Sequence, residues 1–122
     1  MASELRVNTL KDASGNNSVA MSTVAGASNK AWNSIDGTGT LAIRDSFNVS
    51  SVSDDGTGDY RTTFTSAMVN DDYACPLGSA VSNDFVDNTD IATTAVTVKL
   101  FNLAASQVDN DPATFSIVGD LA

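Results

Sequence analysis

The chain has 122 residues, a length that suits one domain built around one hydrophobic core. It carries six Lys and Arg against fifteen Asp and Glu, with no His, so its net charge is −9. This charge argues against binding to nucleic acid or to anionic membranes, because both are recognised chiefly through basic side chains.

Large apolar side chains are scarce. Sixteen of the apolar residues are Ala, so a monomer would have a thin core, and thin cores are commonly supplemented by oligomerisation. We therefore expect a homo-oligomer. No apolar run approaches the ~20 residues of a membrane span, and the first residues lack the basic and apolar regions of a secretory signal. We expect no membrane insertion, and the lone Cys75 fits synthesis in a reducing cytoplasm.

The chain begins with an alternating run at residues 3–11, with Leu5, Val7 and Thr9 on one side, which predicts a strand. Asp, Asn and Gly residues after it predict a turn. We therefore divide the chain into an N-terminal strand and turn at 1–17 and a single β-sandwich domain at 18–122. Further short strands are predicted at 18–24 and at 30–35, and no segment has a convincing helical pattern.

The clearest element is a β-hairpin in the middle of the chain. Two runs of strand-forming residues, 47–53 and 60–65, flank a turn whose Gly residues can adopt the positive φ of a tight reversal. On the second run Tyr60, Thr62 and Phe64 share one face. The alternation predicts that this face points toward the core and that the opposite, polar face is exposed to solvent.

The second half of the chain continues in short strands. Residues 73–76 predict a brief strand, which Pro76 confines to a sheet edge or strand end. Residues 79–90 are polar without a sustained period, which predicts an exposed loop, and residues 91–103 form the longest alternating run. The last strand is predicted at 114–118. Short strands at roughly ten-residue spacing predict an all-β fold, an antiparallel β-sandwich of jelly-roll-like form.

Three sequence motifs follow one another within residues 30–73. They are KAW at 30–32, DGTGTLAIRDSFNVSSV at 36–52 and DGTGDY at 55–60, followed by Phe64, Ala67, Met68 and Tyr73. This segment resembles a recurring segment of bacteriophage tail-fibre and related virion proteins. The resemblance implies a homotrimeric virion structural protein, made in the host cytoplasm, that contacts other tail or capsid proteins. It also implies that Leu5, Val7 and Thr9 are docking residues.

Exposed loops on a rigid β scaffold are common places for binding specificity. We therefore expect the sandwich to display acidic loops toward a glycan or protein of the host surface. The candidate receptor contacts are Tyr73, Asp84, Phe85, Asp87 and Asp90. Trp32 is expected in the core instead, because it is the only Trp in a chain that is short of large apolar groups.

The usual groups of catalysis are missing from the sequence. Without His there is no Ser-His-Asp or Cys-His arrangement, and Cys75 is expected to be a small buried residue. The acidic turn at 54–59 lacks the spacing of an EF-hand loop, and Asp is common in turns. We therefore expect no enzyme, no cofactor and no bound metal. The alternatives to host attachment are a capsid decoration or head-fibre protein without receptor binding, a carbohydrate-binding module, and a hydrolase that uses two Asp.

Overall fold

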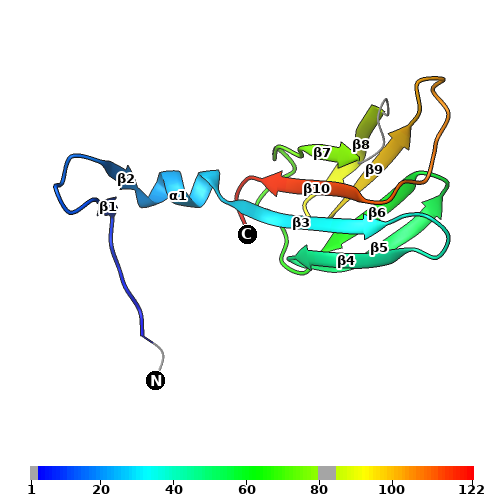
Figure 1. The fold of residues 1–122 in the computed structure, drawn as a ribbon. Coiled ribbons are helices and arrows are strands. Elements are labelled where there is room, and N and C mark those ends of the chain that lie inside the picture. The colour runs from blue at the N-terminus through cyan, green and yellow to red at the C-terminus, as the bar shows by residue number, and fades with distance from the viewer. Residues whose placement is uncertain (1–2, 80–84) are drawn as a thin grey trace.

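The computed structural model describes residues 3–79 and 85–122, with the backbone alone for 85–88. Two four-stranded sheets lie face to face (Figure 1), with strand orders β4-β3-β10-β7 and β5-β6-β9-β8. All neighbouring strands in them are antiparallel, so the expected all-β sandwich is confirmed. The strands are β3 (Asn29–Asp36), β4 (Ala42–Phe47), β5 (Val49–Gly56), β6 (Asp59–Phe64), β7 (Leu77–Ser79), β8 (Phe85–Ala92), β9 (Ala95–Phe101) and β10 (Ala113–Val118).

The core follows the alternation of the strands. In β6 the buried side chains are Tyr60, Thr62 and Phe64, as predicted. In β10 Phe115 and Ile117 point inward, which also confirms the expected face. The core is completed by side chains of β3, of β9, of the first residue of β10 and of the segment after β6: Ala31, Ile35, Met68, Tyr73, Val96, Val98, Leu100 and Ala113.

One polar contact joins the two sheets inside this core. Asn33 Nδ2 of β3 donates a hydrogen bond to Thr62 Oγ1 of β6 at 3.1 Å, and the two residues are 3% and 1% exposed. A buried amide without such a partner would cost about 1 to 3 kcal/mol. The pair therefore favours one alignment of the two sheets over shifted ones.

The N-terminal arm, which we define as residues 3–28, projects from one end of the sandwich (Figure 1). It contains a short antiparallel hairpin of β1 (Thr9–Lys11) and β2 (Ser18–Ala20), followed by the helix α1 (Met21–Ala27). The first strand of the sandwich begins only at Asn29. The boundary that we predicted after residue 17 falls inside the hairpin, so residues 18–28 belong with the arm.

Two predictions for the arm are wrong in detail. The strand expected at residues 3–11 forms only over the three residues for which β2 provides a partner. The strand expected at residues 18–24 ends at Ala20, and no helix was expected, yet α1 follows β2 directly. The helix has no side-chain cap and no buried residue, so packing within the described chain does not stabilise it.

The segment after residue 79 also differs from prediction. Part of the expected loop is strand, because β8 begins at Phe85 and pairs with β9. The expected long strand is interrupted at Thr93 and Thr94, a turn without Gly or Pro that gave no signal in the sequence. Residues 73–76 form only an isolated bridge between Ala74 and Val118, and β7 is the edge strand instead.

Candidate functional site

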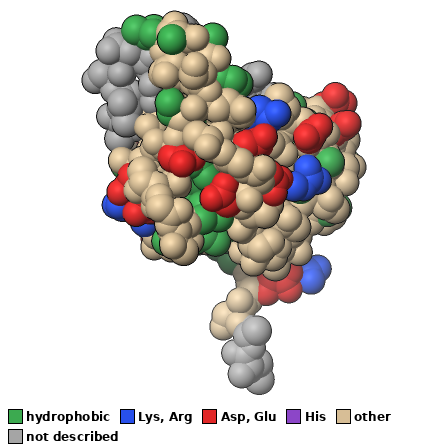
Figure 2. All heavy atoms as spheres, turned by 90° about the vertical axis from the view of Figure 1, so that its right-hand side faces the viewer, with side chains coloured by type: hydrophobic (Ala, Val, Ile, Leu, Met, Phe, Trp, Pro, Cys, Tyr) green, Lys and Arg blue, Asp and Glu red, His purple; other side chains and the backbone are tan. Residues whose placement is uncertain are grey.

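The end of the sandwich opposite the arm is built from the β3–β4, β5–β6 and β9–β10 connections (Figure 1). Figure 2 faces this side of the molecule and shows carboxylate side chains gathered around a smaller hydrophobic area. We call it the acidic end and define it by the Asp residues of these connections and their flanking strand ends: Asp36, Asp54, Asp55, Asp59, Asp109 and Asp111. It presents negative charge away from the arm.

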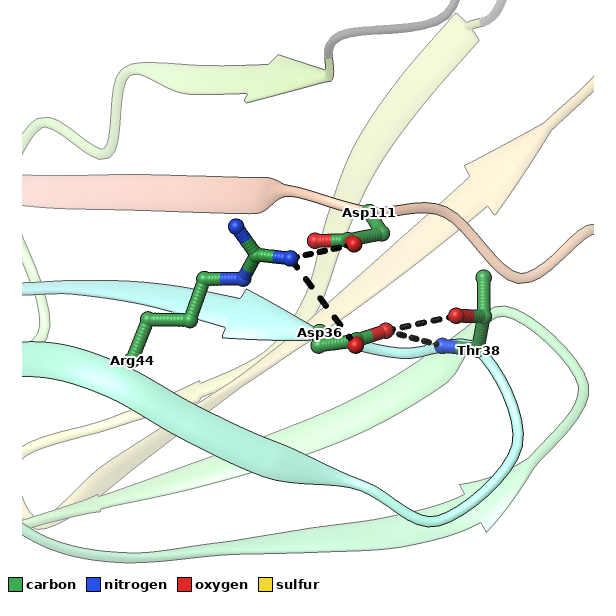
Figure 3. A network of polar contacts seen from close by, with 4 residues as sticks. All are labelled: Asp36, Thr38, Arg44 and Asp111. Carbon is green, nitrogen blue, oxygen red and sulfur yellow. Dashed lines mark hydrogen bonds and ion pairs between the residues drawn. The ribbon is translucent and has the colours of Figure 1, made fainter.

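Arg44 of β4 links two carboxylates of the acidic end (Figure 3). Its Nη2 pairs with Asp111 and lies 3.9 Å from Asp36 Oδ2. The other oxygen of Asp36 accepts hydrogen bonds from the Thr38 hydroxyl at 2.6 Å and from the Thr38 N–H at 2.9 Å. These hydrogen bonds hold the pKa of Asp36 below its ordinary value. The network therefore keeps the Asp36 carboxyl ionised. It also fixes the β3–β4 turn beside the β9–β10 connection.

A second network fixes the β5–β6 turn. Asp109 Oδ1 lies 2.6 Å from the N–H of Gly58 and 2.7 Å from the hydroxyl of Tyr60, and it accepts a hydrogen bond from each. Burial and the neighbouring Asp109 carboxylate raise the pKa of Tyr60, so its hydroxyl remains a donor. Asp109 thus serves the turn as a structural acceptor.

Two observations bear on metal binding and on nucleophilic chemistry. In the part of the chain that the structure describes, no group of three or more His, Cys, Asp or Glu side chains could hold a metal ion. Cys75 is half-buried, and burial raises the pKa of its thiol to about 11. A thiol that stays protonated at neutral pH is a poor nucleophile. At the acidic end, the networks of Asp36 and Asp109 hold negative charge in a fixed arrangement.

Tyr73, which we predicted as an exposed receptor contact, is buried at 8% exposure. Its ring packs edge-to-face against Phe64, with centroids 6.1 Å apart. Its hydroxyl donates to the carbonyl oxygen of Ala92 at 3.0 Å. The prediction is wrong because the acidic turn before Tyr73 returns the chain to the sandwich, where this ring fills the core.

The other predicted contacts lie on or before β8. Asp84 lies outside the described residues. The backbones of Phe85 and Asp87 pair with β9, which places both residues on a strand. Asp90 is exposed and has a φ of 48° at the point where the pairing of β8 and β9 shifts. With Tyr73 in the core, the predicted contacts do not form one surface.

The predicted docking residues Leu5, Val7 and Thr9 all lie in the arm. Leu5 is 81% exposed and Val7 is 37% exposed. Every residue of the arm is exposed apart from the half-buried Met21. Further apolar side chains of the arm are exposed on its hairpin and helix: Leu10, Val19 and Val24. The arm therefore presents an apolar surface that no described part of this chain covers.

Trp32, which we predicted in the core, lies on the outer side of its sheet. The alternation of β3 buries Asn33 and Ile35, so Trp32 has the opposite parity and is only half-buried. It borders an open groove of about 360 Å³. Its partner across β4 is Phe47, which is 53% exposed. The prediction is wrong because the alternation of β3, and not the size of the Trp side chain, decides which face of the sheet Trp32 occupies.

The described part of the chain contains no helix with the length and apolarity needed to cross a membrane. Comparison of the chain with models of protein families, with curated proteins and with solved structures finds no match in any of the three.

Proposed function

We propose that the chain is a structural protein of a bacteriophage particle, a module that joins a larger assembly through its N-terminal arm. The arm carries this proposal, because it has a defined hairpin and helix without a core of its own. An isolated two-stranded hairpin is at best marginally stable in water, and a seven-residue helix is too short to persist alone. Such a segment keeps its form when a partner covers its apolar side chains.

The partner that we propose first is the arm of further copies of the chain, in a homotrimer. Leu10 and Val19 are direct cross-strand partners in the hairpin, so they share a face, and they are 44% and 36% exposed. Three such faces packed together would supply the apolar contact that the thin sandwich core lacks. The resemblance of residues 30–73 to virion fibre proteins supports threefold association and a place in the particle.

The sandwich would then be the displayed part. The acidic end lies opposite the arm (Figure 1), so assembly through the arm leaves the acidic end facing outward. This orientation supports attachment to a host surface in a tail appendage. It supports equally a decoration or head-fibre protein that coats a capsid, because both need one fastening end and one free end.

The assembly role of the arm is tested by measuring the mass of the full chain by sedimentation, with Leu10→Asp as the arm variant. We expect a trimer for the unchanged chain and a monomer for Leu10→Asp, with the thermal unfolding of the sandwich retained. The matched control is Leu103→Asp, which places the same charge on a 64% exposed Leu of the β9–β10 connection. Two results would contradict a role of the arm in self-assembly. One is a Leu10→Asp variant that is still a trimer, and the other is an unchanged chain that is already a monomer.

The place in a particle is tested by imaging intact virions that contain the chain and by counting its copies. Sets related by threefold symmetry at the tail would support host attachment. A lattice of copies on the capsid would support decoration and would end the receptor proposal. Absence of the chain from purified particles would overturn the virion proposal altogether.

A further inference from the structure

The groove beside Trp32 lies on the outer face of the β4-β3-β10-β7 sheet. Strand β3 contributes Trp32 and Ser34, and strand β10 contributes Thr114 and Ser116. The segment Pro76, Leu77 and Gly78 forms the opposite border. The groove is open along the sheet and has a volume of about 360 Å³, within the range of small-ligand sites.

The register of the strands arranges these side chains in two rows. Trp32 is opposite Phe47 on one side and opposite Ser116 on the other. In the next row Ser34 is opposite Thr114, which is opposite Gly78. Directly opposite residues share a face of a sheet. The outer face therefore offers an aromatic surface with a hydroxyl-bearing surface beside it.

The hydroxyls in the groove are available to a ligand. Among the described residues, the side chains of Ser34, Thr114 and Ser116 make no hydrogen bond to another part of the chain. Each hydroxyl can both donate and accept, so this surface suits a ligand that carries hydroxyls of its own.

The lining is also uncharged, although the chain has a net charge of −9. The nearest charge in the rows is Asp45, which is opposite Ser34 on β4 and is exposed. A carboxylate at this border accepts hydrogen bonds from neutral hydroxyls and repels anions. The charge distribution therefore favours a neutral ligand over an acidic one.

Gly78 keeps the groove open. A Cβ at this position would lie 2.8 Å from Thr114 Oγ1, closer than such atoms normally approach. Any larger residue would press on Thr114 and occupy the space above it. The absence of a side chain at Gly78 thus leaves the Thr114 hydroxyl accessible from the groove.

We propose that this groove binds one or two residues of a neutral hexose glycan. One face of a hexopyranose ring is lined by C–H groups and packs on an aromatic ring, while its edge carries the hydroxyls that Ser and Thr side chains bind. Trp32, which lines the groove, would supply the stacking surface, extended by its neighbour Phe47 on β4, and Thr114 and Ser116 would supply the hydrogen bonds. The proposal goes beyond the assembly role of the arm and does not depend on it.

The test uses the full chain and neutral oligosaccharides of glucose, galactose, mannose and N-acetylglucosamine, with sialyllactose as the anionic comparison. Trp32 is the only Trp, so its fluorescence reports directly on the groove. We expect saturable binding of at least one neutral oligosaccharide and at least tenfold weaker binding of sialyllactose. Trp32→Ala should weaken the neutral ligand at least tenfold when binding is followed by saturation-transfer NMR.

Three further variants keep the test decisive if Trp32→Ala fails to fold. Thr114→Val removes a hydroxyl at nearly constant volume, and Gly78→Ala narrows the groove, so each should weaken binding several-fold. Thr57→Val makes the same change at an exposed Thr of the acidic end and should leave binding unchanged. Leu10→Asp should also bind normally, which separates this proposal from the assembly of the arm.

Three outcomes would overturn the proposal. The first is no binding of any neutral oligosaccharide at ~10 mM, a concentration that reveals even millimolar affinities. The second is binding that Thr114→Val and Gly78→Ala leave intact, which would place the glycan elsewhere. The third is a change of oligomeric mass in these variants, which would identify the groove as an interface between copies of the chain.

Discussion

The Tyr60 hydroxyl, 2.7 Å from Asp109 Oδ1, connects the centre of the core to the β9–β10 connection. Tyr60 is 1% exposed, and the same carboxylate oxygen caps the Gly58 N–H. Tyr60→Phe should lower the free energy of unfolding by about 1 to 3 kcal/mol, because the buried Tyr60 hydroxyl and its charge-assisted hydrogen bond to Asp109 are lost. Urea unfolding measures the change. In an Asp109→Ala background the same substitution should cost clearly less, and an equal cost in both backgrounds would contradict the coupling.

Gly58 of the acidic end combines a left-handed backbone conformation with close backbone neighbours. Its φ is +63°, and a Cβ there would lie 2.5 Å from the Val108 carbonyl oxygen and 2.8 Å from that of Leu100. Gly58→Ala should therefore destabilise the fold by roughly 2 to 4 kcal/mol, from the left-handed conformation and the backbone clash together. Gly39 is the matched control, with a φ of +66° and nothing within 4 Å. Gly39→Ala should cost only about 1 to 2 kcal/mol by thermal unfolding, and equal costs would show that the clash relaxes freely.

The buried pair of Asn33 and Thr62 should behave asymmetrically on substitution. Thr62→Val keeps the volume but leaves the Asn33 amide without its acceptor, so we expect a loss of about 1 to 3 kcal/mol. Adding Asn33→Leu removes the orphaned amide and should recover part of this loss. The four proteins of the cycle are compared by urea unfolding. Strictly additive costs would mean that the hydrogen bond across the sheets contributes nothing specific.

Stability should fall in alkaline solution. Burial raises the pKa of Tyr73 from 10.0 to about 12 and that of Cys75 from 9.0 to about 11. The folded chain therefore keeps protons that the unfolded chain releases above pH 9 to 10. Because a raised folded pKa stabilises the protonated form, the contribution of these two groups to stability is constant below about pH 9 and declines from there to about pH 12.

Unfolding by urea at a series of pH values checks this alkaline decline. Tyr73→Phe removes one of these two groups and should make the decline shallower, and Cys75→Ala should shift its beginning to higher pH. Tyr60, whose pKa is also raised by burial, extends the decline to still higher pH in all of these proteins. A stability curve that stays level to about pH 11 would contradict the burial of these groups.

Much of the sandwich was predictable because its signals are local. The hairpin of β5 and β6 combines a Gly-containing turn with strands whose alternation identifies Tyr60, Thr62 and Phe64 as core. The turn between β8 and β9 was not predictable, since Thr93 and Thr94 carry no turn signature. Strand pairing decided that region, and pairing between strands cannot be read from composition.

The candidate surfaces were harder to predict than the fold. Trp32 and Ile35 are three residues apart in β3, so their side chains point to opposite faces of the sheet. The sequence therefore contained a signal for the outward position of Trp32. That Phe47 and Ser116 flank Trp32 depends on the register of three strands, which no local pattern specifies. Tyr73 shows the converse, because its burial depends on a distant contact with Phe64.

The chain leaves the sandwich at the end where it enters. Val118 of β10 pairs with Asn29 of β3, and the C-terminus lies near the start of β3 (Figure 1). The N–H of Ala122 donates to the carbonyl oxygen of Ala67 at 2.9 Å. A domain fused after Ala122 would therefore crowd the arm. A peptide or domain that is to be displayed away from the arm should be inserted in the β9–β10 connection. Leu103 is 64% exposed there, and an insertion disturbs little packing. As a display scaffold, the protein would accept its payload in a loop rather than at its terminus.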